Sequence, residues 1–336
     1  MKAREGDLIE TIDGLILDVK GLVHPPRKVI AFPRFIPNPQ GEREREGVKY
    51  SKVYNISTRF KFLEQKFPQY IVYDSVFDEQ LCEVPAEDIK RYYKPVNRLR
   101  ELRCCENLDE LERDALKFLE LLKRCTNIPW SKVGISGSLL VKLHTPKSDI
   151  DPVFYGTENC HKIYETLKTT HKDKENAIRP YSKEELQRLY QFRFQDTQTS
   201  FKDFLKTESR KVLQGKFKNR DYFIRFIKDR LEINAEYGMI CYKNVGYARI
   251  KAEIEADSEA IFTPCSYELR NVTVLNGTRL KIDEIASFRG RFCEQARTGE
   301  VIIAQGKVEK VTDKRHNREH FRLLIGNKPS DFMVLA

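Results

Sequence analysis

The sequence predicts an α+β protein, and three kinds of segment within its 336 residues support this class. Residues 6–36 hold short β-branched and aromatic runs separated by Asp-Gly, Lys-Gly and Pro-Pro pairs, a pattern typical of strands joined by tight turns. From Asn107, apolar residues recur with the spacing of an amphipathic helix. Beyond Pro264, alternating runs are separated by Asn-Gly and Arg-Gly turns. We therefore expect a β-rich N-terminal domain (1–100), a mixed α/β core (101–262) and a small C-terminal β-barrel-like domain (263–336).

Composition favours a soluble, cytoplasmic protein. Hydrophobic residues make up 40% of the chain, and no apolar run approaches the roughly 18 residues that cross a bilayer. The chain opens without a secretory signal pattern, so we expect no membrane partner. Eight cysteines occur without a C-x-x-C pair, and Cys104 and Cys105 are adjacent, which suits neither a structural zinc site nor a disulfide framework. A reducing compartment fits this usage best.

The expected core alternates helices and strands. Asn107 and Glu110 stand in capping-box positions at the start of its first helix. Ser182 and Glu185 do the same for a later helix. The other expected elements of the core are a buried strand at 132–137, a short helix at 138–143, a second strand at 149–155, a helix within 199–213 and a long strand at 246–256.

Two aspartates, Asp149 and Asp151, stand one residue apart on the second core strand. Side chains alternate along a strand, so both carboxylates should lie on one face, about 6–7 Å apart along the backbone. Such a pair repels unless a cation lies between its members, and oxygen ligands that leave room for water and phosphate suit magnesium. Upstream, Gly137 permits close approach of the backbone, and Ser138 begins a helix whose free N–H groups can hold a triphosphate.

Gly137-Ser138, followed eleven residues later by Asp149-Ile150-Asp151, resembles the nucleotidyltransferase superfamily of DNA polymerase beta, poly(A) polymerases and CCA-adding enzymes. Ser148 completes an "SDID" sequence similar to the form often seen there. The match covers roughly residues 130–156, and the whole chain resembles archaeal predicted nucleotidyltransferases. The resemblance implies a mixed-sheet nucleotidyltransferase core, two Mg²⁺ ions, a bound nucleoside triphosphate and attack by a hydroxyl group. Gly137, Ser138 and Ser148 would then contact the nucleotide.

The resemblance also implies a third carboxylate, on a later neighbouring strand. Glu253 or Glu255 on the expected strand 246–256 would fit, and Asp229 is a competitor. We favour Glu253, which makes Asp149, Asp151 and Glu253 the predicted catalytic and metal-binding residues. The alternative is that Glu253 belongs to a solvated strand face, whose Arg and Lys neighbours form cross-strand ion pairs.

The net charge of +10 favours an anionic partner. Residues 179–230 contain 14 Lys and Arg against 7 Asp and Glu, so the basic surplus is concentrated there. A solvated helix face would explain part of this run, but aromatic residues interleave with it, which favours nucleic acid. Arg289 and Arg291 could form a second basic face on an RNA-binding β domain. The predicted nucleic-acid or phosphate contacts are Lys202, Lys206, Arg210, Lys216 and Lys218.

The sequence therefore predicts a magnesium-dependent nucleotidyltransferase that moves a nucleoside monophosphate from a nucleoside triphosphate to a hydroxyl group, on RNA. One alternative is a non-catalytic nucleic-acid-binding protein that keeps the fold, which an absent third carboxylate would favour. Another is an enzyme that acts on a protein or a small molecule. His144, between Ser138 and Asp149, is interpreted as an incidental loop histidine.

Overall fold

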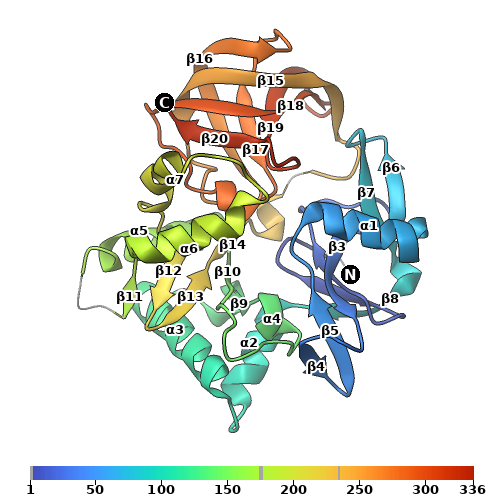
Figure 1. Cartoon of the computed structure of the whole chain (residues 1–336), viewed down its shortest axis with the longest axis vertical. Coiled ribbons are helices and arrows are strands. Elements are labelled where there is room, and N and C mark those ends of the chain that lie inside the picture. Colours follow the sequence, from blue (N-terminus) through green and yellow to red (C-terminus); the bar gives the residue numbers. More distant parts are fainter. Residues whose placement is uncertain (1–2, 174–176, 234) are drawn as a thin grey trace. The chain divides into compact units, whose positions relative to one another are not determined.

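The computed structural model describes residues 3–173, 177–233 and 235–336, and it confirms a mixed α+β protein with curled sheets (Figure 1). The chain forms two compact units, each assembled from separate segments. Unit 1 contains Met1–Val72, Leu81–Arg179 and Val212–Asn234, and unit 2 contains Tyr73–Gln80, Pro180–Lys211 and Ala235–Ala336. The division at residues 100 and 262 expected from the sequence stays a prediction. Among the described helices, none has both the length and the apolar character needed to span a bilayer.

The N-terminal sheet lies in unit 1 except for residues 73–80 and has the strand order β4-β5-β3-β2-β1-β8, and β7 also pairs with β3 and β6. Helix α1 (Ile56–Lys66) contributes Leu63 to the core on one face of the sheet. The other face buries Leu8, Ile16 and Phe35 against residues 140–143. The strands are β1 (Leu8–Thr11), β2 (Ile16–Val19), β3 (Lys28–Pro37), β4 (Arg43–Arg45), β5 (Val48–Lys52), β6 (Ile71–Asp74), β7 (Glu79–Pro85) and β8 (Ile89–Tyr93).

A second, smaller sheet of unit 1 has the order β14-β10-β9, with β10 antiparallel to β9 and parallel to β14. A third sheet, β11-β12-β13, lies beside helix α3, whose Phe118 ring centroid is 4.9 Å from that of Phe217 on β12. The elements are α2 (Pro95–Cys104), α3 (Glu110–Thr126), β9 (Val133–Ile135), α4 (Gly137–Leu140), β10 (Pro152–Tyr155), α5 (Thr157–Thr170), β11 (Ile178–Arg179), β12 (Gln214–Phe217), β13 (Arg220–Phe223) and β14 (Arg225–Ile227).

The start of α3 corrects one local prediction. Its capping box is formed by Asp109 and Glu112, two residues after the expected pair Asn107 and Glu110. Asp109 Oδ1 accepts from the Glu112 backbone N–H at 2.8 Å, and Glu112 returns a bond to the Asp109 N–H. Both registers satisfy the sequence pattern, so the motif alone did not separate them. The predicted box at Ser182 and Glu185 is confirmed.

Strand pairing in unit 2 closes into a ring. The order β15-β16-β17-β19-β18-β20 is completed by pairing of β15 with β18 (orange and red strands in Figure 1). Alternate residues of β15, including Ile250 and Ile254, are buried inside the ring. Strand β15 starts earlier than expected and pairs with the C-terminal strands. The elements are α6 (Lys183–Phe194), α7 (Phe201–Glu208), β15 (Ile240–Ala256), β16 (Cys265–Gly277), β17 (Glu284–Ser287), β18 (Val301–Asp313), β19 (Arg318–Leu324) and β20 (Phe332–Leu335).

Candidate metal and phosphate site

Asp149 and Asp151 lie directly before β10 in unit 1 and flank Ile150. Ile150 forms a parallel bridge with Tyr222: its N–H donates to the Asp221 carbonyl at 2.9 Å, and its carbonyl accepts from the Phe223 N–H at 3.0 Å. The strand expected at 149–155 therefore starts later, at Pro152, and the two aspartates flank a single buried bridge residue instead of lying within the strand.

Gly137 starts α4 in contact with Asp151. Its φ is +62°, and a Cβ atom built at this position would lie 1.8 Å from Asp151 Oδ2. The Ser136 N–H also donates to the Asp151 carbonyl, at 2.8 Å. Only glycine fits here, because both the left-handed backbone and the space require it. The sequence predicted close approach to a ligand, and the close neighbour in this structure is the carboxylate itself.

The two serines of the predicted nucleotide contacts differ. Ser138 is buried, and its Oγ atom has no hydrogen-bond partner in the described part of the chain. Ser148 is also buried, but its Oγ accepts from the Thr145 N–H at 2.9 Å and so closes a turn. A buried hydroxyl without a partner is costly, so Ser138, unlike Ser148, has an unmet hydrogen-bonding capacity.

Burial and repulsion make the charge on Asp151 costly. Asp151 is 8% exposed. Burial, and then the neighbouring Asp149 carboxylate, raise the pKa of Asp151 to about 6, although Arg225, Lys52 and Arg34 act in the opposite direction. Among the described residues, neither aspartate has a side-chain hydrogen bond or ion pair. A cation between them would relieve both unfavourable effects.

A third carboxylate, that of Asp221, aligns with this pair. Asp221 lies on β13 next to Tyr222, so the Ile150–Tyr222 bridge places it opposite Asp149 on the neighbouring parallel strand. Aligned residues of parallel strands project to the same face. Its side chain is 51% exposed and pairs with Lys216 Nζ at 3.0 Å. The sequence prediction missed Asp221, although it is an acidic residue directly before the apolar run "YFIRFI".

The carboxylates considered from the sequence lie elsewhere. Glu253 is on β15 in unit 2, which pairs with β16 and β18, and its carboxylate is bound by Arg270 and by Asn271 Nδ2. The cross-strand ion pair of the alternative interpretation is therefore present, while a metal role for Glu253 stays a prediction. Asp229 follows the far end of β14, where it pairs with Lys132 and caps a short 3-10 helix, Arg230–Glu232.

Cationic side chains near Asp151 come from distant parts of the sequence. Arg34 on β3, Lys52 on β5 and Arg225 on β14 all lower its pKa through their charges. Arg225 is itself held 3.5 Å from Asp18 and 3.6 Å from Glu5. Arg34 and Lys52 are half-buried and lie over the exposed Tyr54 ring, at 5.4 and 4.9 Å from its centroid. They were not predicted, since only the fold brings the N-terminal sheet to Asp151.

The five predicted basic contacts are divided between the two units, and their shared role stays a prediction. Lys216 and Lys218 belong to unit 1, where they pair with Asp221 and, at 2.7 Å, with Asp114. Lys202, Lys206 and Arg210 belong to unit 2. Arg210 follows the end of α7 and binds Glu300 at 2.6 Å, while Lys202 and Lys206 are exposed on the helix.

The loop before the aspartates is held at several carbonyl groups. Arg98 Nε donates to the Leu139 carbonyl at 2.9 Å, Arg43 Nη1 to that of Leu143 at 2.5 Å and Arg220 Nη1 to that of Pro146 at 2.7 Å. These contacts fix the path of the chain between α4 and Asp149, so the site does not depend on a freely moving loop.

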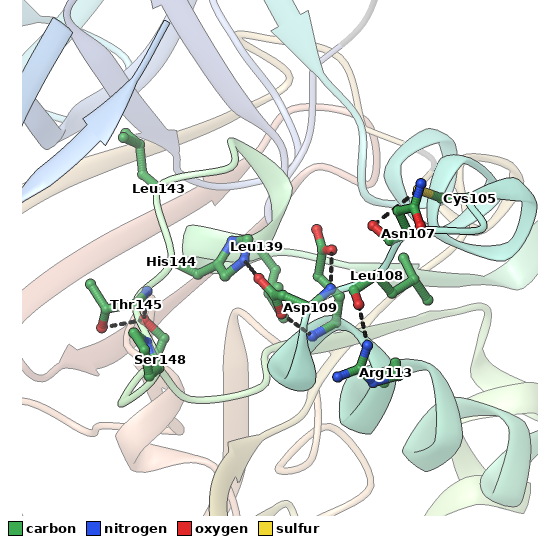
Figure 2. Close-up of polar contacts among 12 residues, drawn as sticks. Cys105, Asn107, Leu108, Asp109, Arg113, Leu139, Leu143, His144, Thr145 and Ser148 are labelled. Carbon is green, nitrogen blue, oxygen red and sulfur yellow. Dashed lines mark hydrogen bonds and ion pairs between the residues drawn. The ribbon is translucent and has the colours of Figure 1, made fainter. Parts of the chain in front are cut away.

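His144, in the same loop, has a structural partner at the start of α3. Figure 2 shows its ring directed at Asp109, with 2.6 Å between Nε2 and Oδ2. Asp109, Glu112 and His144 have possible ligand atoms within 4.8 Å of one another. Both carboxylates are already engaged in the α3 capping box, and Glu112 also binds Arg98 at 2.6 Å. A histidine-containing set is also not one that Mg²⁺ prefers, so we interpret this group as a loop anchor.

Comparison with known proteins gives one relationship and no assigned activity. The chain is similar to an uncharacterised protein of Methanocaldococcus jannaschii, with 35% identity over 340 residues that cover 99% of this chain and 98% of that protein. No protein-family model and no solved structure matches the chain.

Proposed function

The chain belongs to the same family as this M. jannaschii protein, and we propose that it is a magnesium-dependent nucleotidyltransferase. The observation that carries the proposal is the row of carboxylates at one strand edge: Asp149 and Asp151 flank Ile150, and Asp221 aligns with Asp149 on the next strand. A nucleotidyltransferase core with a cytoplasmic location is part of this proposal. The absence of disulfides among the eight cysteines of the described structure supports that location.

Asp149 and Asp151 have the donor chemistry that suits a divalent metal, and Asp221 would leave its ion pair with Lys216 to join them. The carboxylates of Asp149 and Asp151 have no protein partner among the described residues, and the raised pKa of Asp151 means that its charge needs a counter-ion. All three candidate ligands are oxygen donors, which suits Mg²⁺ with room for water and phosphate. We therefore propose Asp149, Asp151 and Asp221 as the metal ligands, with Asp221 in the position that the sequence analysis gave to Glu253.

The triphosphate would lie between this edge and the N-terminal sheet. Arg34 and Lys52 supply positive charge close to Asp151, and Ser138 supplies an unsatisfied hydroxyl. Guanidinium and ammonium groups recognise phosphate by charge-assisted hydrogen bonds. The exposed Tyr54 ring beside Arg34 and Lys52 offers a surface for the base.

In the proposed reaction, a hydroxyl oxygen attacks the α-phosphorus, a new P–O bond forms and pyrophosphate leaves. Bound Mg²⁺ would supply charge stabilisation on the phosphates and a lower pKa for the attacking hydroxyl. The carboxylate row orients the reacting groups, while Arg34 and Lys52 neutralise charge on the leaving pyrophosphate. RNA is the proposed acceptor, since the chain carries a net charge of +10.

Transfer of labelled nucleotide tests the proposal. The protein is incubated with MgCl₂, RNA and each α-³²P nucleoside triphosphate, and the products are separated on a denaturing gel. We expect labelled RNA from the wild type and a loss of about 100-fold or more for Asp149→Asn and Asp151→Asn. If the label appears on protein or on a small molecule and not on RNA, the acceptor is that molecule and not RNA. Transfer that persists in both variants would contradict the proposal.

A further inference from the structure

Two arginines of unit 2 share a single carboxylate. Arg289 and Arg291 flank Gly290, and each places its Nη2 atom near Asp196 Oδ2, at 2.9 and 3.2 Å. Two guanidinium groups on one carboxylate leave one positive charge uncompensated within this trio. We call Asp196, Arg289 and Arg291 the Asp196 cluster.

The cluster is largely buried but reaches the surface. The Arg289 and Arg291 side chains are 20% and 16% exposed, and that of Asp196 is 16% exposed. Burial, together with the charges of Arg289 and Arg193, lowers the pKa of Arg291 to about 9. The surroundings of Arg291 therefore disfavour its positive charge, and a further anion would stabilise it. The basic face expected on a β strand is therefore not observed: Arg289 precedes, and Arg291 lies in, a short 3-10 helix, Gly290–Phe292, and both are largely buried.

An exposed aromatic ring lies two residues before Asp196. Phe194, at the end of α6, is 44% exposed. Its ring packs 5.4 Å from that of Tyr190, which also contacts Phe201 and Phe204 at 5.3 Å. These contacts hold the Phe194 ring in place while leaving part of it accessible. A positioned aromatic ring two residues from the carboxylate that binds both arginines is suited to stacking a base of a strand whose phosphate lies on the guanidinium groups.

Further positive charge lies on the helix that follows α6. Lys202 and Lys206 are exposed on α7, and the contact of Tyr190 with Phe201 and Phe204 joins the two helices. Lys202 and Lys206 are therefore further cations of unit 2, on the helix that packs against the end of α6. Contacts of such cations with phosphate position a strand without reading its sequence.

We propose that the Asp196 cluster binds a phosphate group of a single-stranded nucleic acid, with a base of that strand stacked on Phe194. The phosphate takes the place of the Asp196 carboxylate on Arg289 and Arg291, whose planar donors match phosphate oxygens. The identification of this strand as the acceptor rests on the proposed function. The binding itself needs neither metal nor nucleoside triphosphate, so it is measured separately.

A purely structural role for the cluster makes different predictions. Arg289 Nη1 also donates to the Gly326 carbonyl at 3.2 Å, and Arg291 Nη1 to Thr197 Oγ1 at 3.2 Å. If the arginines only held the segments around Gly326 and Thr197 in place, removing the Asp196 carboxylate would destabilise the protein and leave its affinity for nucleic acid unchanged. If Asp196 competes with phosphate, its removal strengthens binding.

The test is fluorescence anisotropy of an end-labelled single-stranded RNA of about twelve nucleotides, with EDTA present. Asp196→Asn is expected to bind about tenfold more tightly than the wild type, because it frees both guanidinium groups. Asp283→Asn is the matched control: it removes a carboxylate of unit 2 that pairs with the exposed Lys281. Phe194→Ala should weaken RNA binding about fivefold or more. Circular dichroism confirms that each variant is folded.

Several outcomes would overturn the inference. One is an Asp196→Asn variant whose affinity equals that of Asp283→Asn. Another is displacement of RNA by inorganic phosphate at constant ionic strength together with unchanged binding by Phe194→Ala, because the site would then recognise free phosphate alone. A protein that binds RNA in this way but transfers no nucleotide would keep this inference and remove the proposed function.

Discussion

At the scale of single residues, the burial of Asp151 has a cost that the metal-free protein carries. Its pKa is raised from 3.8 to about 6, so ionisation of this group at neutral pH opposes folding. We expect Asp151→Asn to stabilise the metal-free protein at pH 7 by an amount on the order of 1–3 kcal/mol. Urea unfolding in EDTA measures this change. Asp221→Asn is the control, since Asp221 is half-exposed and ion-paired, and a destabilised Asp151→Asn variant would contradict the expectation.

The same shift sets a pH dependence. An acid whose pKa is raised on folding favours the folded state below its unfolded pKa, and its contribution is lost as the pH rises from 3.8 to about 6. Mg²⁺ can offset this loss of stability only where Asp151 is ionised, because the ion binds the carboxylate and not the protonated acid. The increase in Tm produced by Mg²⁺ should therefore be small near pH 5 and several degrees at about pH 7.5. An equal increase at both pH values would remove Asp151 from the metal site.

Asp221 and Glu253 compete for the role of third ligand, and substitution separates them. We expect Asp221→Asn to lower nucleotide transfer by about 100-fold and Glu253→Gln to change it less than about threefold. The reason is that Asp221 aligns with Asp149, whereas Glu253 is bound by Arg270 on another sheet. Initial transfer rates at saturating Mg²⁺ measure the difference. A larger loss for Glu253→Gln than for Asp221→Asn would favour Glu253 as the third metal ligand, as the sequence predicts.

Part of the candidate site was predictable from local sequence. The acidic pair and Gly137 are close together along the chain, and their spacing alone suggested a shared site. Asp221, Arg34 and Lys52 were not predictable in this way, because they join the site through strand pairing and packing across long sequence separations. The most informative missed signal was an acidic residue just before an apolar run.

At the scale of elements, the junction between α4 and the acidic segment is the tightest part of the site. Gly137→Ala would combine a strained φ of +62° with a clash against Asp151 Oδ2, so we expect a loss of roughly 2–4 kcal/mol in unfolding free energy. Gly47→Ala is a matched control, since Gly47 has φ +77° but no neighbour within 4 Å of the added Cβ. Equal losses in the two variants, measured by urea unfolding, would show that the contact with Asp151 has no energetic effect.

The positions of helices and strands were predicted better than the strands with which they pair. Periodicity located α3 and the strand around 246–256, and the Ser182 capping box was confirmed. The alternation of buried and exposed residues along β15 says that one face is covered, but not by which strands. The sequence predicts this strand as part of the core at 101–262, and its hydrogen bonds in the structure go to β16 and β18.

At the scale of the whole molecule, strand β15 closes the ring of unit 2 although it precedes the expected boundary at residue 262. Fragment 263–336 lacks β15 and would expose the edges of β16 and β18. We therefore expect this fragment to be unfolded or aggregated by circular dichroism and gel filtration. Fragment 235–336, which contains β15, should show more cooperative thermal unfolding. A fragment 263–336 that folds as a monomer would contradict this account of unit 2.

The central claim is that Asp149 and Asp151 hold a divalent cation beside a triphosphate. Titration of Mn²⁺, a paramagnetic substitute for Mg²⁺, followed by electron paramagnetic resonance with and without a non-hydrolysable nucleoside triphosphate analogue, tests it most directly. We predict that the wild type binds Mn²⁺ more tightly when the analogue is present, and that Asp149→Asn and Asp151→Asn lose both the binding and this coupling. Unchanged Mn²⁺ binding in both variants would contradict the claim.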